Sequence, residues 1–384
     1  MRIAILGSVV LPVPPPKQGG TEWIAYYQAK GLSDLGHKII LFAARGSVQG
    51  ENYELFEVGR DTLVEPKLSS VKPDQDLFGI SSFASPALQS HSPRGQAIID
   101  QAIDTESSRG LRKENVYLAE VIEELIKRKD DYDIILNNMR GEAVLLPLAK
   151  MLDKPFVNIM HLPLFRELAD LFSKYNTHII TVSNAQRNNF PGLNYLATIY
   201  NCVDTDKFLF EASPQDYLLM MGTIGRHKNQ KAAIKVAKNL GMKLILAGKI
   251  RDFDYYKELE KDIDGEKIRW VGELGFEEKL RLYQNAKALL FPVLWEEPFG
   301  LVMIEAMACG TPVVAYKNGA IPEVIVDGET GFVIENNTEE EMTEAVKKID
   351  TIKRKNCRKH VMENFTVEKM VRNYEAALKK ILPK

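Results

Sequence analysis

Residues 288–315 read ALLFPVLWEEPFGLVMIEAMACGTPVVA. The apolar run at 288–292 is typical of a buried strand, and a second apolar run follows at 312–315. Between them, Pro298 and Gly300 allow a tight turn, after which a helix is predicted to begin near Gly300. A strand, a crossover helix and another strand make the βαβ unit of a parallel sheet that helices cover on both faces. This stretch therefore predicts an α/β fold.

The same alternation of short apolar runs and amphipathic stretches extends along the chain. In the first half, strands are predicted at 2–6, 38–44, 133–137, 155–159, 178–182 and 196–200. In the second half, they are predicted at 217–221, 243–247, 268–271, 288–292, 312–315 and 331–334. The pattern predicts two doubly wound, Rossmann-like domains. They would face a cleft between the carboxyl ends of their two sheets, where ligands bind in such folds.

The domain boundary is expected where the last predicted strand of the first half leads into a polar, proline-containing segment. We predict an N-terminal domain over residues 1–200 and a C-terminal domain over residues 201–365. Residues 366–384 would form a last helix that either crosses back to the first domain or caps the second. Residues 66–110 are the least regular part and are rich in Ser and Pro, and the sequence assigns neither the structure nor the role of residues 50–110.

The composition argues against several classes of protein. The 384 residues include 50 Lys and Arg against 52 Asp and Glu, a net charge of −2, which argues against nucleic-acid binding through a basic face. Three cysteines are too few for a disulfide framework. No stretch approaches the roughly 18 consecutive apolar residues of a membrane span, and no signal-peptide pattern opens the chain. We therefore expect a cytoplasmic protein, with weak contact to a membrane surface left open.

Two glutamates flank the predicted helix start at Gly300. Glu297 lies in the loop before it, and Glu305 lies within the helix. The free amides of a first helical turn form an anion site, and five residues of helix rise about 7–8 Å, the scale of a diphosphate between two sugar rings. One carboxylate could then bind hydroxyls of one sugar and the other those of a ribose. The alternative is that both glutamates are solvated surface charges.

Two further glycine-rich turns precede predicted helices. Residues 222–229 read GTIGRHKN and combine two glycines with Arg226 and Lys228, which suits phosphate oxygens or is simply a solvated turn. Residues 19–22 read GGTE, with Thr21 as the predicted N-cap, and the glycines allow either a close helix–strand approach or a ligand contact. The fingerprint G-x-G-x-x-G is absent, which disfavours a nicotinamide oxidoreductase.

His161 follows the strand predicted at 155–159, at the edge where ligands of a parallel sheet bind. A lone histidine is more often structural, so both interpretations are kept. No Cys/His metal spacing, H-E-x-x-H motif or G-x-S-x-G motif is present. We therefore expect no metal and no other cofactor. The three cysteines are interpreted as buried small hydrophobic residues.

Taken together, these segments resemble family 4 of the retaining glycosyltransferases, which have the GT-B fold, and in particular the group that includes bacterial antibiotic-glycosylating enzymes. The resemblance is strongest over residues 217–335. Its most specific element is the pair Glu297 and Glu305, separated by seven residues. Residues 319–324 (GAIPEV), residues 327–332 (DGETGF) and the GGTE segment also match the family pattern.

The resemblance implies transfer of a sugar from a nucleotide-diphosphate sugar to an acceptor hydroxyl with retention of configuration. By the same resemblance, Glu297 would contact the donor sugar, Glu305 the ribose and Lys228 the diphosphate, and His161 would lie beside the donor sugar at the reaction centre. The donor site would also contain Gly222, Thr223, Arg226, Phe299, Gly300 and Leu301. The loop of Gly19, Gly20 and Thr21 would lie near the phosphate or the acceptor. No protein nucleophile and no metal would then be needed.

Two positions depart from the family pattern. Thr223 stands where the family has arginine, so either Arg226 replaces that charge or the phosphate is bound differently or more weakly. Cys202 stands for a glycine, which predicts a reshaped turn. A GT-B phosphorylase, a nucleotide-sugar epimerase, a two-domain sugar-binding protein and a catalytically silent sugar-nucleotide-binding subunit stay open as alternatives. The sequence identifies neither the sugar, the base and the acceptor nor the oligomeric state.

Overall fold

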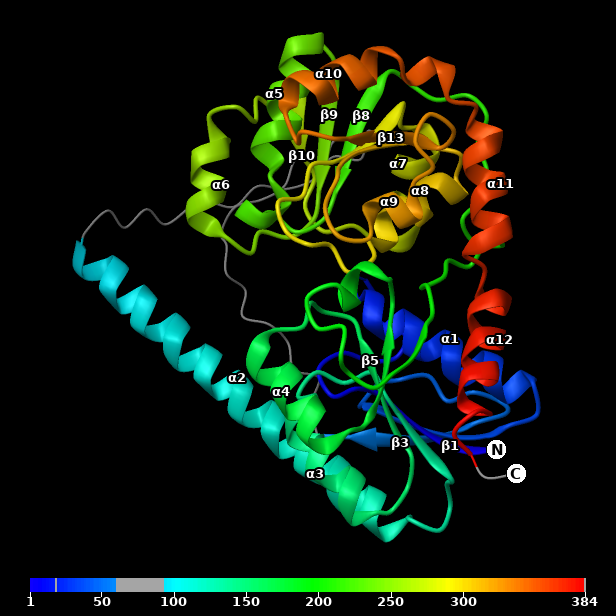
Figure 1. Cartoon of the computed structure of the whole chain (residues 1–384). Coiled ribbons are helices and arrows are strands. Elements are labelled where there is room, and N and C mark those ends of the chain that lie inside the picture. The colour runs from blue at the N-terminus through cyan, green and yellow to red at the C-terminus, as the bar shows by residue number, and fades with distance from the viewer. Residues whose placement is uncertain (18, 60–92, 383–384) are drawn as a thin grey trace.

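The computed structural model describes residues 1–17, 19–59 and 93–382, with the backbone alone for 93–108. Two parallel sheets with helices between their strands form two lobes, and Figure 1 shows the lobe of the second half of the chain above that of the first. The prediction of two doubly wound α/β domains is confirmed. Among the described residues, none of the helices is both long and apolar enough to span a bilayer.

The first sheet has seven parallel strands in the order β3-β2-β1-β4-β5-β6-β7. The strands are β1 (Arg2–Ser8), β2 (Lys38–Ala44), β3 (Glu54–Val58), β4 (Ile134–Asn137), β5 (Phe156–Met160), β6 (His178–Thr181) and β7 (Tyr195–Thr198). The helices of this half are α1 (Gly20–Asp34), α2 (Pro93–Lys127), α3 (Glu142–Met151) and α4 (Arg166–Tyr175). The strand order reverses at β1, which lies between β2 and β4. The carboxyl end of β1 is therefore where such a sheet binds ligands.

The second sheet has six parallel strands in the order β10-β9-β8-β11-β12-β13 and reverses at β8. The strands are β8 (Tyr217–Met221), β9 (Lys243–Ala247), β10 (Ile268–Trp270), β11 (Ala288–Phe291), β12 (Val313–Tyr316) and β13 (Gly331–Ile334). The helices are α5 (Gln230–Leu240), α6 (Phe253–Glu260), α7 (Phe276–Asn285), α8 (Leu301–Ala308), α9 (Ile321–Val324), α10 (Glu339–Lys347), α11 (Arg354–Asn364) and α12 (Val367–Leu378). The carboxyl ends of β8 and β11 precede the two segments that the sequence analysis selected as anion sites.

Three local predictions differ from the structure. Strand β3 was not predicted, because its sequence ELFEV places two glutamates at the edge of the sheet, where they stay exposed. The sequence predicts a helix only near 114–128, where the structure has the end of the much longer α2. The predicted N-cap Thr21 is wrong: α1 begins at Gly20, and the N-cap is Gly19, whose φ of 157° a residue with a side chain rarely adopts.

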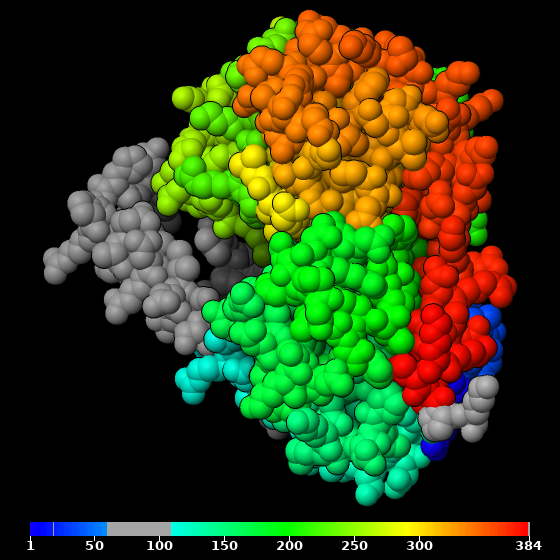
Figure 2. Space-filling view, viewed as in Figure 1, coloured from blue at the N-terminus to red at the C-terminus, as the bar shows by residue number. Residues whose placement is uncertain are grey.

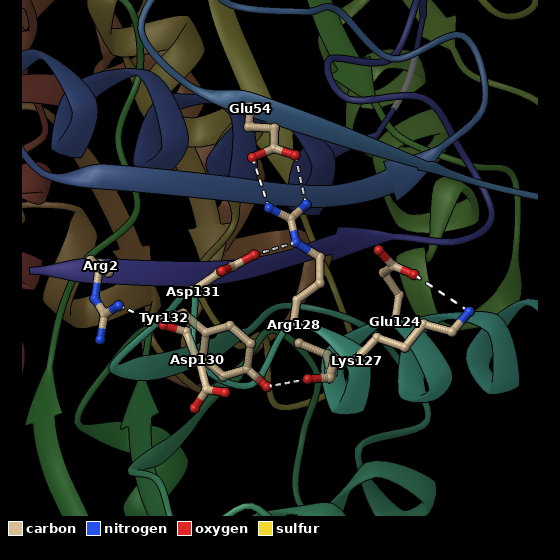
Figure 3. Close-up of polar contacts among 9 residues, drawn as sticks. Arg2, Glu54, Glu124, Lys127, Arg128, Asp130, Asp131 and Tyr132 are labelled. Carbon is tan, nitrogen blue, oxygen red and sulfur yellow. Dashed lines mark hydrogen bonds and ion pairs between the residues drawn. The ribbon is translucent and has the colours of Figure 1, made fainter.

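Ion pairs attach the end of α2 to the edge strand β3, as Figure 3 shows. Arg128 donates from both Nη atoms to the two carboxylate oxygens of Glu54, at 2.6 and 2.8 Å, and from Nε to Asp131 at 2.8 Å. The hydroxyl of the buried Tyr132 donates to the carbonyl of Leu125 at 2.7 Å. A bidentate guanidinium–carboxylate pair fixes geometry as well as charge. It therefore positions the C-terminal turn of α2 on the sheet.

The last helix, α12, packs against α1 of the first domain, although it follows the last helix of the second (Figure 1). A Cβ on Gly31 would lie 2.4 Å from Val371, so the two helices approach closely at that glycine. His37 and Glu375 form a further contact at 3.0 Å. Figure 2 shows the C-terminal segment running along the side of both lobes. The chain therefore connects the domains twice, at residues 199–204 and at the junction of α11 and α12.

Glu323 of α9 joins the domains at a third place. Its carboxylate accepts hydrogen bonds from the backbone N–H groups of Asn184 and Ala185, at 2.8 and 2.7 Å, and from the hydroxyl of Tyr200 at 2.9 Å. The Asn184 side chain adds a fourth bond at 3.0 Å. Burial, with Glu323 as the second cause, raises the pKa of Tyr200 to about 12, so its hydroxyl stays a donor at neutral pH. One carboxylate of the second domain thus satisfies several donors of the first.

We expect Glu323→Ala to weaken the contact between the domains. Hydrogen bonds to a charged group contribute about 1.5–3 kcal/mol each, and this substitution removes all of those that Glu323 accepts. Small-angle X-ray scattering should then show a larger radius of gyration. Glu329→Ala, which removes an exposed glutamate of the same domain, should leave the scattering curve unchanged. Identical curves for Glu323→Ala and the wild type would show that this carboxylate does not hold the domains together.

Candidate functional site

A cavity of about 280 Å³ lies between the two domains. The first domain contributes the start of α1, with Gly19, Gly20 and Trp23. The second contributes the end of β8, the loop before α8 and one side of α7 and α8. Of the predicted site residues, the lining includes Gly19, Gly20, Gly222, Lys228, Glu297, Gly300, Leu301 and Glu305. These predicted residues lie up to 286 positions apart in the sequence, and the fold brings them together at one cavity.

Lys228 and Glu297 form a buried ion pair at one side of the cavity. Lys228 Nζ lies 2.9 Å from Glu297 Oε2, and the indole N–H of Trp295 donates to the same oxygen at 2.9 Å. The ammonium also lies 4.8 Å from the centre of the Trp295 ring. Only 9% of the Glu297 side chain and 16% of the Lys228 side chain are exposed. A charge buried this deeply needs a partner of opposite sign, and each supplies it to the other.

Glycines allow the backbone to hold this pair in place. Gly319 has a φ of 58°, and a Cβ there would lie 2.4 Å from the carbonyl oxygen of Glu297. The same carbonyl accepts a hydrogen bond from the N–H of Ala320 at 2.9 Å. Segment 319–324, which the sequence analysis noted only as a family match, therefore packs directly on the backbone of Glu297. The same segment contains Glu323. It therefore contacts both the backbone of Glu297 at the cavity and residues of the first domain.

The N-termini of α1 and α8 meet at the cavity. Gly300 has a φ of 83° and is the N-cap of α8, where a Cβ would lie 2.5 Å from Met303. A Cβ on Gly20 would lie 2.6 Å from Leu301 Cδ1, so the first residue of α1 lies against the first residue of α8. The first amides of a helix have no partner within the helix, and they carry the positive end of its dipole. The N-terminal ends of two helices, α1 and α8, therefore lie at the cavity.

Glu305 lies on the same side of α8 as the cavity. Lys279 donates to its Oε1 at 2.9 Å, and the hydroxyl of Tyr283 donates to its Oε2 at 2.8 Å. Both partners come from α7 and are four residues apart, so they occupy one face of that helix. Burial and the charge of Glu305 raise the pKa of Tyr283 well above its usual value. Lys279 was not predicted from the sequence, because its partner lies on another helix 26 residues away.

Besides His161, four predicted residues do not line the cavity. Arg226 instead faces α6, where it pairs with Glu258 and Asp252 and lies 5.3 Å from the Tyr255 ring centre. Thr223 is bound through its carbonyl oxygen, which accepts from Gln230 Nε2 at 2.9 Å. Thr21 lies in the first turn of α1 but outside the lining. The Phe299 side chain is buried against Tyr200 and Phe365, with ring centres 6.0 and 5.7 Å away. The structure therefore does not bring Arg226 to the position of the charge that Thr223 lacks.

His161 follows β5 and lies outside the cavity lining. Its Nε2 lies 2.9 Å from Asn138 Oδ1. Burial, with a smaller contribution from the positive charge of Arg140, lowers the pKa of His161 to about 3. The imidazole is therefore neutral at pH 7.

The altered turn at the domain boundary has a conformation that suits a side chain. Among the described residues, the non-glycine positions with positive φ are Asp153, Asn176, Asn229 and Asn337. Cys202 is not one of them, and it is buried and lines the cavity. The backbone at Cys202 therefore does not have the left-handed conformation that favours glycine. All three cysteines are buried and unpaired as disulfides.

Lys207, in the segment that follows the domain boundary, also lines the cavity. Lys207 lies 5.1 Å from the ring centre of Trp23, across the domain boundary. In the part of the chain that the structure describes, no three His, Cys, Asp or Glu side chains are grouped to hold a metal ion. The cavity is thus lined by lysines, two glutamates, glycines and aromatic rings. This set can bind an anion and hydroxyl groups together.

Comparison with known proteins finds glycosyltransferases. Residues 204–364 match the family model described as "Glycosyl transferases group 1". The O-antigen chain mannosyltransferase RfbU of Salmonella typhimurium is 29% identical over 203 residues, 49% of this chain and 55% of that protein. The N-acetyl-alpha-D-glucosaminyl L-malate synthase of Bacillus anthracis is 32% identical over 152 residues, 38% of this chain and 39% of that protein. The chain thus spans about half the length, or less, of these curated relatives.

Solved glycosyltransferase structures share the fold over the whole chain. AviGT4, a glycosyltransferase involved in avilamycin A biosynthesis, superposes with a TM-score of 0.65 at 20% identity, covering 99% of this chain and 97% of that chain. Anabaena Alr3699/HepE in complex with UDP-glucose superposes with a TM-score of 0.67 at 18% identity, covering 99% and 100%. These likenesses show that the two lobes are arranged as in the GT-B fold.

We expect Lys228→Met to destabilise the protein through the glutamate it leaves unpaired. Removing one partner of a buried ion pair costs about 3–5 kcal/mol, and we expect a value near the lower end because part of Lys228 is exposed. The double variant Lys228→Met/Glu297→Gln should recover at least about 1 kcal/mol of this loss, because no buried charge remains. Urea denaturation followed by tryptophan fluorescence measures both values.

The matched control is Lys317→Met. Its ion pair with Glu335 is exposed at both ends, so its removal should cost less than about 1 kcal/mol. Strictly additive effects of the two substitutions at Lys228 and Glu297 would show that the pair is not coupled.

Proposed function

We propose that the protein is a retaining glycosyltransferase that moves a sugar from a nucleotide-diphosphate sugar to an acceptor hydroxyl. The observation that carries this proposal is the interdomain cavity, where two helix N-termini and Lys228 converge between Glu297 and Glu305. A diphosphate is an anion that needs preorganised positive charge, and a sugar and a ribose each offer hydroxyls to a carboxylate. The match of residues 204–364 to a glycosyltransferase family supports the same proposal.

Departure of the diphosphate builds negative charge on the phosphate oxygens. Lys228 and the first amides of α8 lie at the cavity before any reaction, so they can stabilise that charge without rearranging. Groups that interact more strongly with the leaving diphosphate than with the bound donor lower the barrier. The two helix N-termini and Lys228 would therefore provide this stabilisation without a metal ion.

Each glutamate keeps hydrogen-bonding capacity for a hydroxyl. Lys228 and Trp295 both bond to Oε2 of Glu297, and no described residue is recorded as bonding to Oε1. We infer that Oε1 accepts from hydroxyls of the donor sugar. Glu305 uses one lone pair on each oxygen for Lys279 and Tyr283, which leaves a second lone pair on each for the ribose hydroxyls.

Retention follows if the acceptor hydroxyl attacks from the face that the diphosphate leaves. The new bond forms between the acceptor oxygen and the anomeric carbon while the bond to the phosphate oxygen breaks. The departing phosphate takes the proton of the acceptor. In this proposal His161, neutral at pH 7, lies beside the donor sugar and is not the nucleophile. Closure of the two domains excludes water and so protects the donor from hydrolysis.

The relatives support a nucleotide-sugar donor but not one acceptor. HepE has been solved in complex with UDP and with UDP-glucose. The curated relatives include a mannosyltransferase and an L-malate glycoside synthase, whose names indicate different sugars and acceptors. We therefore propose a donor class, a nucleotide-diphosphate hexose, and leave the acceptor as a glycan, lipid-linked or small-molecule hydroxyl.

The donor is identified by thermal shift against UDP-, GDP-, ADP- and dTDP-sugars. A ligand at 100 times its dissociation constant adds about 2.7 kcal/mol of stability, which raises the melting temperature measurably. We expect one base to stabilise the wild type, and Glu305→Ala to lose most of that shift. Failure of every nucleotide sugar to shift the melting temperature would contradict the proposed donor class.

Three alanine variants test the assigned roles. Lys228→Ala and Glu297→Ala should lower turnover at least about tenfold, because each removes an interaction with groups that change charge or position during transfer. Glu305→Ala should mainly raise the KM for the donor. Glu296→Ala, which removes the exposed neighbour of Glu297, is the matched control and should keep wild-type kinetics. Assays of glycoside product in the presence of EDTA should show that activity is kept.

The same assays separate the alternatives. A phosphorylase would require inorganic phosphate, an epimerase would convert the donor without an acceptor, and a silent subunit would bind the donor without turnover. Near-normal kinetics in all three variants would overturn the site assignment.

A further inference from the structure

The Gln186 side chain joins the ends of two neighbouring strands of the first sheet. Strands β5 and β6 pair in parallel as far as Met160 and Thr181, the last partners of their register. Beyond that point, the N–H of Val182 donates to Gln186 Oε1 at 2.8 Å, and Gln186 Nε2 donates to the carbonyl of Met160 at 2.9 Å. The side-chain amide therefore takes the place of a peptide group between the two strand ends.

The same amide holds the backbone on both sides of His161. Its Nε2 group has two hydrogens, and the second is donated to the carbonyl of Leu162 at 3.2 Å. A carbonyl can only accept a hydrogen bond and a backbone N–H can only donate one. The Gln186 amide therefore has a single orientation, with Nε2 toward the carbonyls that flank His161 and Oε1 toward the N–H of Val182.

A second contact holds the His161 ring. Its Nε2 lies 2.9 Å from Oδ1 of Asn138, which follows β4. The Nδ2 group of Asn138 donates in turn to Gln28 Oε1 at 2.8 Å, and both amide side chains are buried. Gln186 thus fixes the backbone of His161, and Asn138 fixes its ring. Because the two contacts act on different parts of the residue, loss of either one gives the imidazole more freedom.

The turn that carries Gln186 is held by the second domain. Residues 185–187 form one turn of 3₁₀-helix, which is a weak structure when it stands alone. The carboxylate of Glu323 accepts from the N–H groups of Asn184 and Ala185, at 2.8 and 2.7 Å, directly before Gln186. Hydrogen bonds to an ionised acceptor are stronger than those between neutral groups. A residue of the second domain therefore stabilises the turn from which Gln186 reaches the two strand ends.

We propose that Gln186 is a positioning residue for His161 and that Glu323 couples this positioning to the contact between the domains. The inference rests on the proposed function only for its effect on transfer, since that function places His161 beside the donor sugar. Separation of the domains would remove the bonds from Glu323 and loosen the turn at 185–187. The segment at 160–162 would then lose its support. His161 is therefore held in position only while the second domain contacts the first.

The direct test is NMR of protein labelled with ¹³C and ¹⁵N in histidine. The His161 ring resonances are assigned by their loss in His161→Gln. Gln186→Met removes every hydrogen bond of the amide at similar side-chain volume, and it should shift or broaden the His161 resonances. Gln186→Glu keeps the acceptor for Val182 and turns a carboxylate oxygen toward the two carbonyls, so it should do the same. Gln186→Glu remains informative if Gln186→Met does not fold.

Gln49→Met is the matched control. Gln49 makes the same set of hydrogen bonds elsewhere in the first domain. Its Nε2 donates to the carbonyls of Gly50 and Tyr53, and its Oε1 accepts from the N–H of Leu55. This variant should leave the His161 resonances unchanged. Unchanged resonances in both Gln186 variants, or equal changes in Gln49→Met, would overturn the positioning role.

The coupling to the second domain is tested with Glu323→Ala. It should change the His161 resonances in the same direction as Gln186→Met, and the double variant should add little, because both substitutions release one support. Glu329→Ala should have no effect. Wild-type His161 resonances in Glu323→Ala would show that the domain contact does not reach His161. These spectra need no substrate, so they decide the inference even if no nucleotide sugar is turned over.

Kinetics then measure the consequence for transfer. Gln186→Met should lower kcat by about threefold to tenfold, because the ring of His161 is less well placed. The KM for the donor should stay within about twofold, since Gln186 lies outside the cavity lining. Gln49→Met should keep both values. A rise in KM with an unchanged kcat, or equal losses in the two variants, would contradict positioning. Complete inactivity of the wild type with every nucleotide sugar would count against the proposed function alone.

Discussion

Lys228 and Glu297 bring opposite charges together at 2.9 Å in a place where water cannot solvate either of them well. Glycines in the nearby backbone make this contact possible. Gly319 lets segment 319–324 pass directly over the backbone of Glu297, and Gly300 turns the chain into α8 within three residues of the carboxylate. The pair fixes the position of one lysine and one carboxylate before any ligand arrives. That preorganisation is what a site for a charged diphosphate requires.

The two domains are held together by contacts that also shape the cavity. Gly20 lies against Leu301, so the starts of α1 and α8 can meet only when the domains are close. Glu323 satisfies two backbone N–H groups of the first domain from a helix whose preceding segment packs on Glu297. Opening the domains would therefore leave donors unpaired and would separate the two helix ends. The closed arrangement of the domains and the shape of the cavity therefore depend on each other.

The sequence predicts well what is encoded by local spacing. Glu297, Gly300 and Glu305 lie within nine residues on one strand–turn–helix unit, so their relation could be foreseen, and so could the alternation of strands that defines both sheets. Lys279 could not, because nothing near it in the sequence indicates that its partner is Glu305. Arg226 was expected at the donor site because of its charge, but Glu258 and Asp252 on a different segment hold it elsewhere. Strand β3 was not predicted because an edge strand can keep its glutamates exposed. Its sequence therefore lacks the continuous apolar run that indicates a buried strand.

Two lysines of the cavity are paired with carboxylates, which bears on how the proposed donor site would bind a diphosphate with Thr223 in place of an arginine. Lys228 is bonded to Glu297 and Lys279 to Glu305, so neither charge is left alone in a site of low dielectric. A diphosphate would add negative charge to a cavity in which these side chains are already balanced. The additional positive potential must then come from groups without carboxylate partners, and the amides at the starts of α1 and α8 are such groups. In the proposed function, a diphosphate would therefore meet these two helix ends together with Lys17 and Lys207, which also line the cavity.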